Sequence, residues 1–233
     1  MAISKECFYL GSEGYLGEPQ ESKILFLMRE PNCGGKVVKE NEFWFRDVVN
    51  GEKSGKTYFQ KLGRIAALIT GEDSADNTES WRKALRKAVY MNINPVCGKG
   101  RASEEYKRAK ELFVSGPNAV CSLEVELSGR KEAFEYPNRW DAINQLPNDS
   151  VIVTVGDIYT ILYEYILKHE NKILINQGRH LEIRTDSGIR YMRSFVFAEG
   201  RKHITVMETY HPATLGRNRF QWNDLSIFRN NQS

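Results

Sequence analysis

The chain has 233 residues, of which 41% are hydrophobic and 27% are charged, and its formal net charge is +3. This balance is ordinary for one globular domain with a substantial core, and it excludes a polybasic binder while allowing a local basic face. No segment approaches the roughly 18 apolar residues of a membrane span, and the first residues show no signal-peptide pattern. We therefore expect a single domain over residues 1–233 that is cytoplasmic and not membrane-associated.

Short apolar segments alternate with segments of helical spacing along the chain. In chain order we predict a strand at 23–31, helices at 58–69 and 80–89, a strand at 88–96, a helix at 103–113, a strand at 150–156, a helix at 157–169 and a strand at 204–212. Each predicted strand is almost continuously apolar at its start, which is typical of parallel strands that are buried on both faces. Ser80 and Asp157 are placed to cap the helices that they begin. The alternation predicts an α/β sandwich around a four-stranded parallel sheet.

Two further segments complete the predicted organisation. Residues 180–200 alternate in polarity, turn at an Asp-Ser-Gly sequence and alternate again, which predicts a β-hairpin inserted before the last strand. Residues 115–149 are rich in turn-forming residues, and no element is predicted there.

Ligands of open parallel sheets bind at the carboxyl ends of the strands, so the functional residues are expected where the four strands end. The four sequences at these ends are REPNCGG, NINPVCGKGR, VGD and TYHPATLGR. They offer an acid, one or two asparagines, a glycine turn and a histidine to one cleft.

These segments resemble those of the uracil-DNA glycosylase superfamily, and the pattern is closest to its bacterial and thermophile branch. TYHPATLGR is similar to the last motif of that branch, and VIVTVGDIYTIL resembles its third strand and the following helix. GKTYFQKLGRIAAL resembles the segment in which a glycine and an aromatic residue precede a helix, and ILFLMREPN occupies the place of the first motif. The resemblance covers most of the chain. It implies a three-layer α/β/α fold around a four-stranded parallel sheet and the hydrolysis of an N-glycosidic bond in DNA.

The resemblance also assigns roles to individual residues around a nucleotide that has been flipped out of the stack. Tyr58 would stack on the base, and either Asn92 or Asn94 would pair with its imide edge, Asn94 being preferred. His211 would stabilise the departing base, and Glu30 would position water and offset the charge that develops on the sugar.

Three residues beyond His211 are predicted to contact the DNA itself. Leu215 lies where the family inserts a wedge into the base stack, and Arg217 and Arg219 would hold flanking phosphates. The expected partner is single- or double-stranded DNA with a flipped uracil or related damaged base, bound by a monomer.

The first motif departs from the family pattern. The branch that the other motifs favour has its acid two residues before the proline, where this chain has Arg29, whereas Glu30 lies directly before Pro31 as the acid does in another branch. A cation beside the sugar would oppose an oxocarbenium-like transition state. The alternative function is therefore a divergent, catalytically inactive member that binds nucleic acid or a nucleobase.

The cysteines do not match the iron–sulfur ligands of the resembled branch. The chain has Cys7, Cys33, Cys97 and Cys121, without the amino-terminal Cys-x-x-Cys pair that the cluster would need. We expect free thiols in a reducing compartment, no cluster and no catalytic metal.

Overall fold

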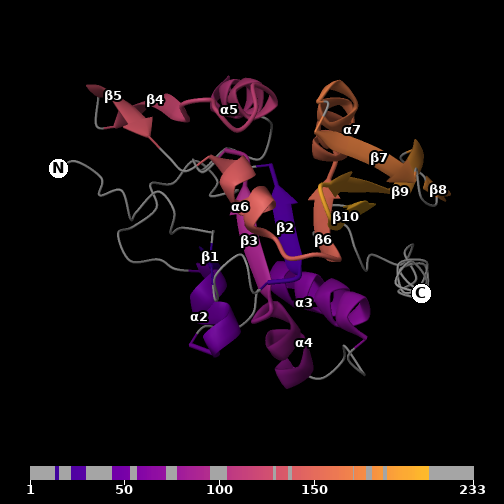
Figure 1. Cartoon of the computed structure of the whole chain (residues 1–233). Coiled ribbons are helices and arrows are strands. Elements are labelled where there is room, and N and C mark those ends of the chain that lie inside the picture. Colours follow the sequence, from indigo (N-terminus) through magenta and orange to yellow (C-terminus); the bar gives the residue numbers. More distant parts are fainter. Residues whose placement is uncertain are drawn as a thin grey trace.

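A computed structural model describes most of the chain (Figure 1). The described residues are 14–15, 22–29, 44–52, 57–71, 78–94, 104–127, 130–135, 138–169, 171–176, 180–185 and 188–209.

The central element is a mixed sheet of eight strands. Its order is β1 (Gly14–Tyr15), β3 (Ala88–Asn92), β2 (Ile24–Met28), β6 (Ser150–Val155), β10 (Lys202–Thr209), β9 (Gly188–Glu199) and β7 (Lys172–Asn176), and β8 (His180–Thr185) pairs with β9. The neighbours β3, β2, β6 and β10 are mutually parallel. The strands β1, β7, β8 and β9 are added in antiparallel orientation.

The predicted α/β class is confirmed, but the sheet is not the four-stranded parallel sheet that we expected. The four predicted strands form its parallel centre, and antiparallel strands extend it on both sides. Every residue of β2, β3 and β6 is buried, which explains why these segments are continuously apolar. The inserted hairpin is also confirmed, since Thr185 of β8 pairs with Gly188 of β9.

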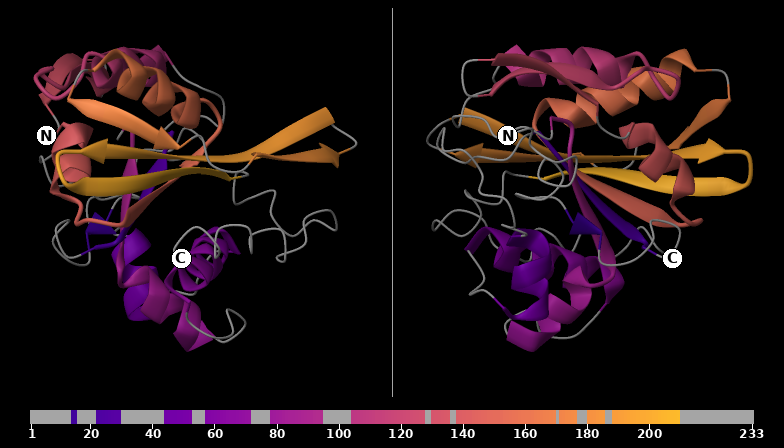
Figure 2. Two further views of the ribbon diagram at one scale, coloured as in Figure 1. Left: turned by 45° about the vertical axis from the view of Figure 1, so that its right-hand side comes forward. Right: turned by 90° about the vertical axis from the view of Figure 1, so that its left-hand side faces the viewer.

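Helices cover both faces of the sheet (Figure 2). One face carries α2 (Trp44–Asn50), α3 (Thr57–Thr70) and α4 (Thr78–Leu85), and the other carries α5 (Glu104–Val114), α6 (Arg139–Gln145) and α7 (Asp157–Lys168). A separate hairpin of β4 (Ser122–Leu127) and β5 (Arg130–Glu135) projects beyond α5 (Figure 1). None of the described helices is both long and apolar enough to cross a membrane.

Helix α4 corrects two details of the prediction. It begins at Thr78 and ends at Leu85, so Ser80 lies inside its first turn and does not cap it. The predicted helix continued to residue 89, but the chain enters β3 at Ala88, because pairing of Ala88 with Ile24 of β2 buries this apolar segment in the sheet.

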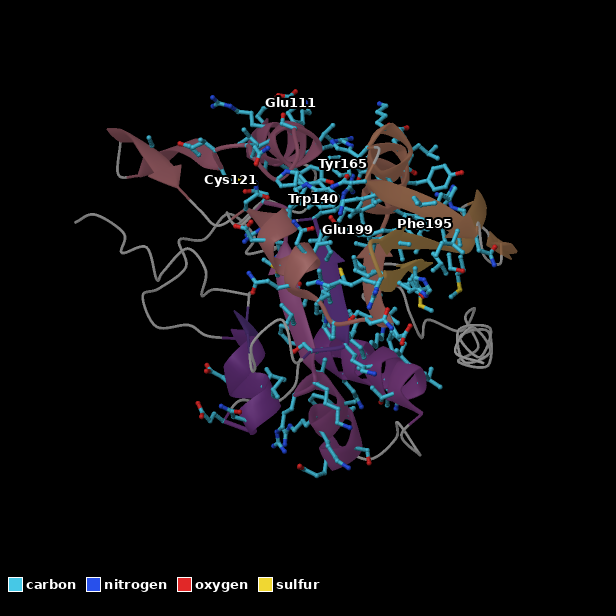
Figure 3. The ribbon with its side chains drawn as sticks, viewed as in Figure 1. Glu111, Cys121, Trp140, Tyr165, Phe195 and Glu199 are labelled. Atoms are coloured by element: carbon cyan, nitrogen blue, oxygen red, sulfur yellow. The ribbon has the colours of Figure 1, made fainter. Side chains whose placement is uncertain are left out.

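A stack of four rings joins the helices of the α5 face. Phe113 stacks on Trp140 at a centroid distance of 4.9 Å, Trp140 on Tyr165 at 4.0 Å, and Tyr165 on His169 at 3.6 Å. The indole N–H of Trp140 donates to the carbonyl of Phe113 at 2.8 Å, which satisfies the one polar atom of this buried ring. Figure 3 shows Trp140 and Tyr165 among these helices. The stack therefore fixes α5 relative to α7, and both helices contribute to the site described below.

Gly63→Ala is expected to destabilise the protein, because Gly63 of α3 lies against Trp81 of α4. A Cβ atom there would lie 2.7 Å from the Trp81 Cβ and 2.8 Å from its carbonyl oxygen. Neither atom is the end of a flexible side chain, so the loss should be about 2 kcal/mol, whereas Gly→Ala in an open helix gains up to about 1 kcal/mol. Urea unfolding of Gly63→Ala and of the control Gln60→Ala measures this, and a gain for Gly63→Ala would contradict the close contact.

Candidate functional site

The topology places a switch point between the carboxyl ends of β2 and β6. The chain leaves β2 and next joins the parallel strands on one side as β3, whereas it leaves β6 and joins them on the other side as β10. The helices that follow these two strands lie on opposite faces of the sheet, α2 to α4 on one and α7 on the other (Figure 2). Such a switch point is where open α/β sheets bind their ligands.

A cluster of polar side chains bridges this switch point. Arg29, directly after β2, places its Nε 3.0 Å from Oδ1 of Asp157, the first residue of α7. Oδ1 also accepts the hydroxyl of Tyr106 at 2.9 Å, and Oδ2 accepts the Nζ of Lys110 at 3.1 Å. The Arg29 guanidinium lies over the Tyr106 ring, 5.2 Å from its centroid. The first turn of α7 is thus tied to β2 and to α5.

The ionisation of this cluster follows from its contacts. Partial burial acts to raise the pKa of Asp157, but Arg29, Lys110 and the Tyr106 hydroxyl outweigh it and hold the pKa below its usual value. Burial acts to lower the pKa of Arg29, yet Tyr106 and Asp157 together raise it. Burial is also the main reason why the pKa of Tyr106 is raised. Asp157 is therefore a fixed anion with both oxygens occupied, and such a carboxylate anchors its neighbours and does not act as a general base.

Asp157 therefore has a different role from the predicted one. The N-cap of α7 is Gly156, at φ 63° and ψ −132°, and no side chain caps the helix. Because Gly156 turns the chain with a positive φ that favours glycine, the Asp157 side chain is free to bind Arg29, Tyr106 and Lys110.

The registers of the parallel strands place one residue of each at a common level near the carboxyl edge: Met28, Asn92, Val155 and Thr209. Two positions further along the chain, the four segments reach Glu30, Asn94, Asp157 and His211. Neighbouring strands are about 4.8 Å apart, so these four segments leave the sheet within about 15 Å of one another. Glu30 and His211 themselves lie outside the described residues, as do Leu215, Arg217 and Arg219.

The two asparagines are both completely buried at the end of β3. Strand β3 ends at Asn92, so the alternation of side chains along a strand does not place Asn94 on the same face. The N–H of Ile93 donates to the carbonyl of Met28, the last residue of β2, at 2.8 Å. The N–H of Asn94 donates to the carbonyl of Arg29, the next residue, at 2.9 Å. Consecutive N–H groups that point to the same neighbour show that the chain bends here.

A buried arginine supports this bend. Arg139, the first residue of α6, donates its Nε to the carbonyl of Asn92 at 2.7 Å and is only 2% exposed. Asn138, the N-cap of α6, accepts the N–H of Trp140 and donates to the carbonyls of Gly116, Pro117 and Ala119. The sequence predicted no role for either residue. The only sequence signal for these roles is the Asn-Arg pair after Pro137, since Asn is a preferred N-cap residue and could mark the start of a helix.

Tyr58, the predicted stacking residue, lies in the first turn of α3 and is partly buried. Its hydroxyl is 2.9 Å from that of Tyr90 in β3, and its ring meets those of Phe59 and Tyr90 edge to face. Burial raises the pKa of Tyr58 to about 12, although the hydrogen bond to Tyr90 lowers it. The structure therefore places Tyr58 as a neutral ring that is anchored to the strand carrying Asn92.

The crevice next to Asn92 and Asn94 is not a base pocket. It is lined by Ile93, Ala109, Phe113, Cys121, Asn138 and Arg139, and it has no room for a water molecule. Within the described ranges, no group of three or more His, Cys, Asp or Glu side chains could hold a metal ion. Of the four cysteines only Cys121 is described, and its buried thiol forms no disulfide.

Two residues of α5 bind the carboxylate of Asp157, and the sequence predicted no role for either of them. Tyr106 and Lys110 are one helical turn apart and so lie on the same face of α5, where both reach Asp157. Their spacing was visible in the sequence, but their partner lies 47 to 51 positions away along the chain.

Comparison with protein-family models, curated proteins and solved structures gives no significant match.

Asp157→Asn is expected to lower the free energy of unfolding by about 1 to 2 kcal/mol at pH 7, because two charged partners lose their anion. The value is modest because Arg29 and Lys110 are about 40% exposed and their charges are screened. The pKa of Asp157 is lowered by folding, so its contribution is complete above the unfolded value near 3.8 and is lost as the pH falls through the folded value. Urea unfolding of both proteins between pH 7 and pH 3 should show the difference shrinking at the acidic end. A constant difference would contradict the ion pairing.

Proposed function

We propose that this chain is a DNA glycosylase-like hydrolase that cleaves the N-glycosidic bond of a flipped uracil or related damaged base in DNA. The observation that carries the proposal is the common level of four chain segments at a topological switch point. These segments are the ones in which the resemblance to the uracil-DNA glycosylase superfamily places the acid, the amide and the histidine. We also propose that the four parallel strands and the helix layers on both faces belong to the three-layer fold of that superfamily.

Each proposed role follows from the chemistry of base release. Glu30 would position a water molecule and offset the positive charge that develops on the sugar. His211 would donate to the base as it leaves with negative charge. Asn94 or Asn92 would pair with the imide edge of the base, and Tyr58 would stack on it. Leu215 would enter the base stack, and Arg217 and Arg219 would bind flanking phosphates.

The position of Arg29 supports an active enzyme over an inactive binder. An arginine beside the sugar would oppose the positive charge that develops there and would favour an inactive protein. The Arg29 side chain is instead held at 3.0 Å from the Asp157 carboxylate and lies over Tyr106. The negative charge of Asp157 at short range offsets part of the positive charge of Arg29, although Lys110 shares the same carboxylate.

The test is a base-release assay. Single- and double-stranded oligonucleotides that carry uracil, hypoxanthine or a thymine mismatch are incubated with the protein and then cleaved at abasic sites by alkali. Strand cleavage with one or more of these bases supports the proposal. Intact strands for every base, together with salt-dependent DNA binding, would overturn it and favour the second candidate, a superfamily member that binds nucleic acid or a nucleobase without cleaving it.

A further inference from the structure

The residue that directly precedes the proposed catalytic acid, Glu30, is held from two sides. Its backbone carbonyl, that of Arg29, accepts the N–H of Asn94 at 2.9 Å, one residue beyond the end of β2. Its side chain places Nε 3.0 Å from Oδ1 of Asp157, and its guanidinium lies over the ring of Tyr106, 5.2 Å from the centroid. We call the side chains of Arg29, Asp157 and Tyr106 the Arg29 clamp. Consecutive Cα atoms are about 3.8 Å apart, so a fixed Arg29 limits where Glu30 can lie.

The partners of Arg29 in the clamp are themselves fixed. Tyr106 is buried, and its hydroxyl donates to the same oxygen of Asp157 that Arg29 contacts. The helices α5 and α7, which carry these two side chains, are joined through the stack of Phe113, Trp140 and Tyr165. The clamp therefore ties the end of β2 to a pair of helices that is packed as one unit.

The clamp has a larger effect on geometry than on stability. The side chains of Arg29 and Asp157 are 43% and 31% exposed, and ion pairs with such exposure contribute little to the stability of a protein. The position of a catalytic group matters more, since a displacement of about 1 Å can slow a reaction by about 10². Three donors that converge on one carboxylate therefore fit a positioning role.

We propose that Asp157 is a positioning residue for the acid of the first motif: through the side chain of Arg29, it holds the start of that motif in place beside Asn94. The resembled branch has its acid at the position of Arg29, so the departure from that pattern here supplies the side chain by which the motif is anchored. The inference rests on the proposed function, because Glu30 is the acid that the clamp would orient.

The first test measures the anchored position without any reaction. The N–H of Asn94 donates to the carbonyl of Arg29, whereas the N–H of Val151 donates at 2.8 Å to the carbonyl of Lys23, which precedes the other end of β2. Amide hydrogen exchange of both groups is followed by NMR. Asp157→Asn should raise the exchange rate of Asn94 relative to that of Val151 by about tenfold, because Arg29 loses its anchor. A general loss of stability would raise both rates together.

Two control variants separate the clamp from charge and from folding. Lys110→Met removes a charge from the same cluster, but it removes the partner of Oδ2 of Asp157 and leaves Arg29 at Oδ1. Gly63→Ala changes α3, which lies on the opposite face of the sheet from α5 and α7 (Figure 2). Both variants should keep the ratio of the two exchange rates within about twofold of the wild type. An unchanged ratio in Asp157→Asn, or an equal rise in either control, would overturn the inference.

The second test measures the consequence for base release. In single-turnover assays on a uracil-containing duplex, Asp157→Asn should release base about ten- to a hundredfold more slowly, while duplex affinity stays within about twofold. The loss falls on the chemical step because the acid is displaced. Lys110→Met should stay within about threefold of the wild-type rate. A wild-type rate in Asp157→Asn, or an equal loss in Lys110→Met, would overturn the positioning role.

The two tests distinguish failure of the clamp from failure of the proposed function. A raised exchange ratio in Asp157→Asn, in a protein that releases no base from any substrate, would leave the clamp standing and remove the proposed hydrolysis. Base release by the wild type, with neither the exchange ratio nor the rate changed in Asp157→Asn, would do the reverse.

Discussion

Glu30→Gln is expected to reduce base release by at least about a hundredfold while duplex affinity stays within about twofold. Glutamine keeps the size of the side chain but carries no charge and cannot accept a proton from water. General-base catalysis contributes about 10² to 10⁴ to the rate of such reactions, and the loss falls on the chemical step and not on binding. Single-turnover assays with a uracil-containing oligonucleotide separate the two quantities.

Two companion variants sharpen this result. His211→Ala removes the donor to the departing base and should also cost about a hundredfold or more, as the loss of an oxyanion donor does in other enzymes. Glu40→Gln changes another acid in the segment that follows the first motif and should leave the rate unchanged. A Glu30→Gln protein that releases base at the wild-type rate would remove Glu30 from the mechanism, whatever the activity of the other variants.

Glu199→Gln is expected to lower the free energy of unfolding by about 3 kcal/mol, whereas Lys172→Met should cost about 1 kcal/mol or less. Lys172 is 2% exposed, and its Nζ lies 2.6 Å from Oε2 of Glu199. The ammonium also lies 5.6 Å from the ring centroids of both Trp140 and Phe197. Figure 3 shows Glu199 near Trp140. Removing the carboxylate leaves a buried charge without its counterion, while methionine fills the same space without a charge.

The double variant tests the explanation. Lys172→Met/Glu199→Gln should be more stable than Glu199→Gln alone, because the uncompensated ammonium is gone. Urea unfolding at pH 7 gives all four free energies. Equal costs of the two single substitutions, with simple addition in the double variant, would contradict the dominant role of the buried charge.

The strands of the parallel centre could be predicted because their signal is local. Segments such as 150–156 are apolar without alternation, and a strand needs that pattern only when both of its faces are covered. The hairpin at 180–200 was equally readable, since alternation and an Asp-Ser-Gly turn specify it together. The antiparallel strands β1 and β7 could not be predicted, because they have only two and five residues and such short segments show no clear polarity pattern.

The structure shows contacts at the carboxyl edge of the sheet that the sequence did not predict. Asp157 was taken for a helix cap, yet its carboxylate binds Arg29, Tyr106 and Lys110. The sequence also did not show that Arg29 pairs with Asp157, which Lys110 binds as well. Both differences have the same cause, which is that the first turn of α7 lies close to α5 and to the end of β2. No property of either segment alone carries that information.

The sequence by itself determined the four strands of the parallel centre, the helices at 58–69, 103–113 and 157–169 and the inserted hairpin, because these depend on local polarity and turn chemistry. Only the tertiary structure decided the strand order, and with it the switch point between β2 and β6. It also decided that side chains as far apart in sequence as Arg29 and Asp157 form an ion pair. These features depend on which apolar faces pack together, and many pairings of the same segments would bury similar apolar area.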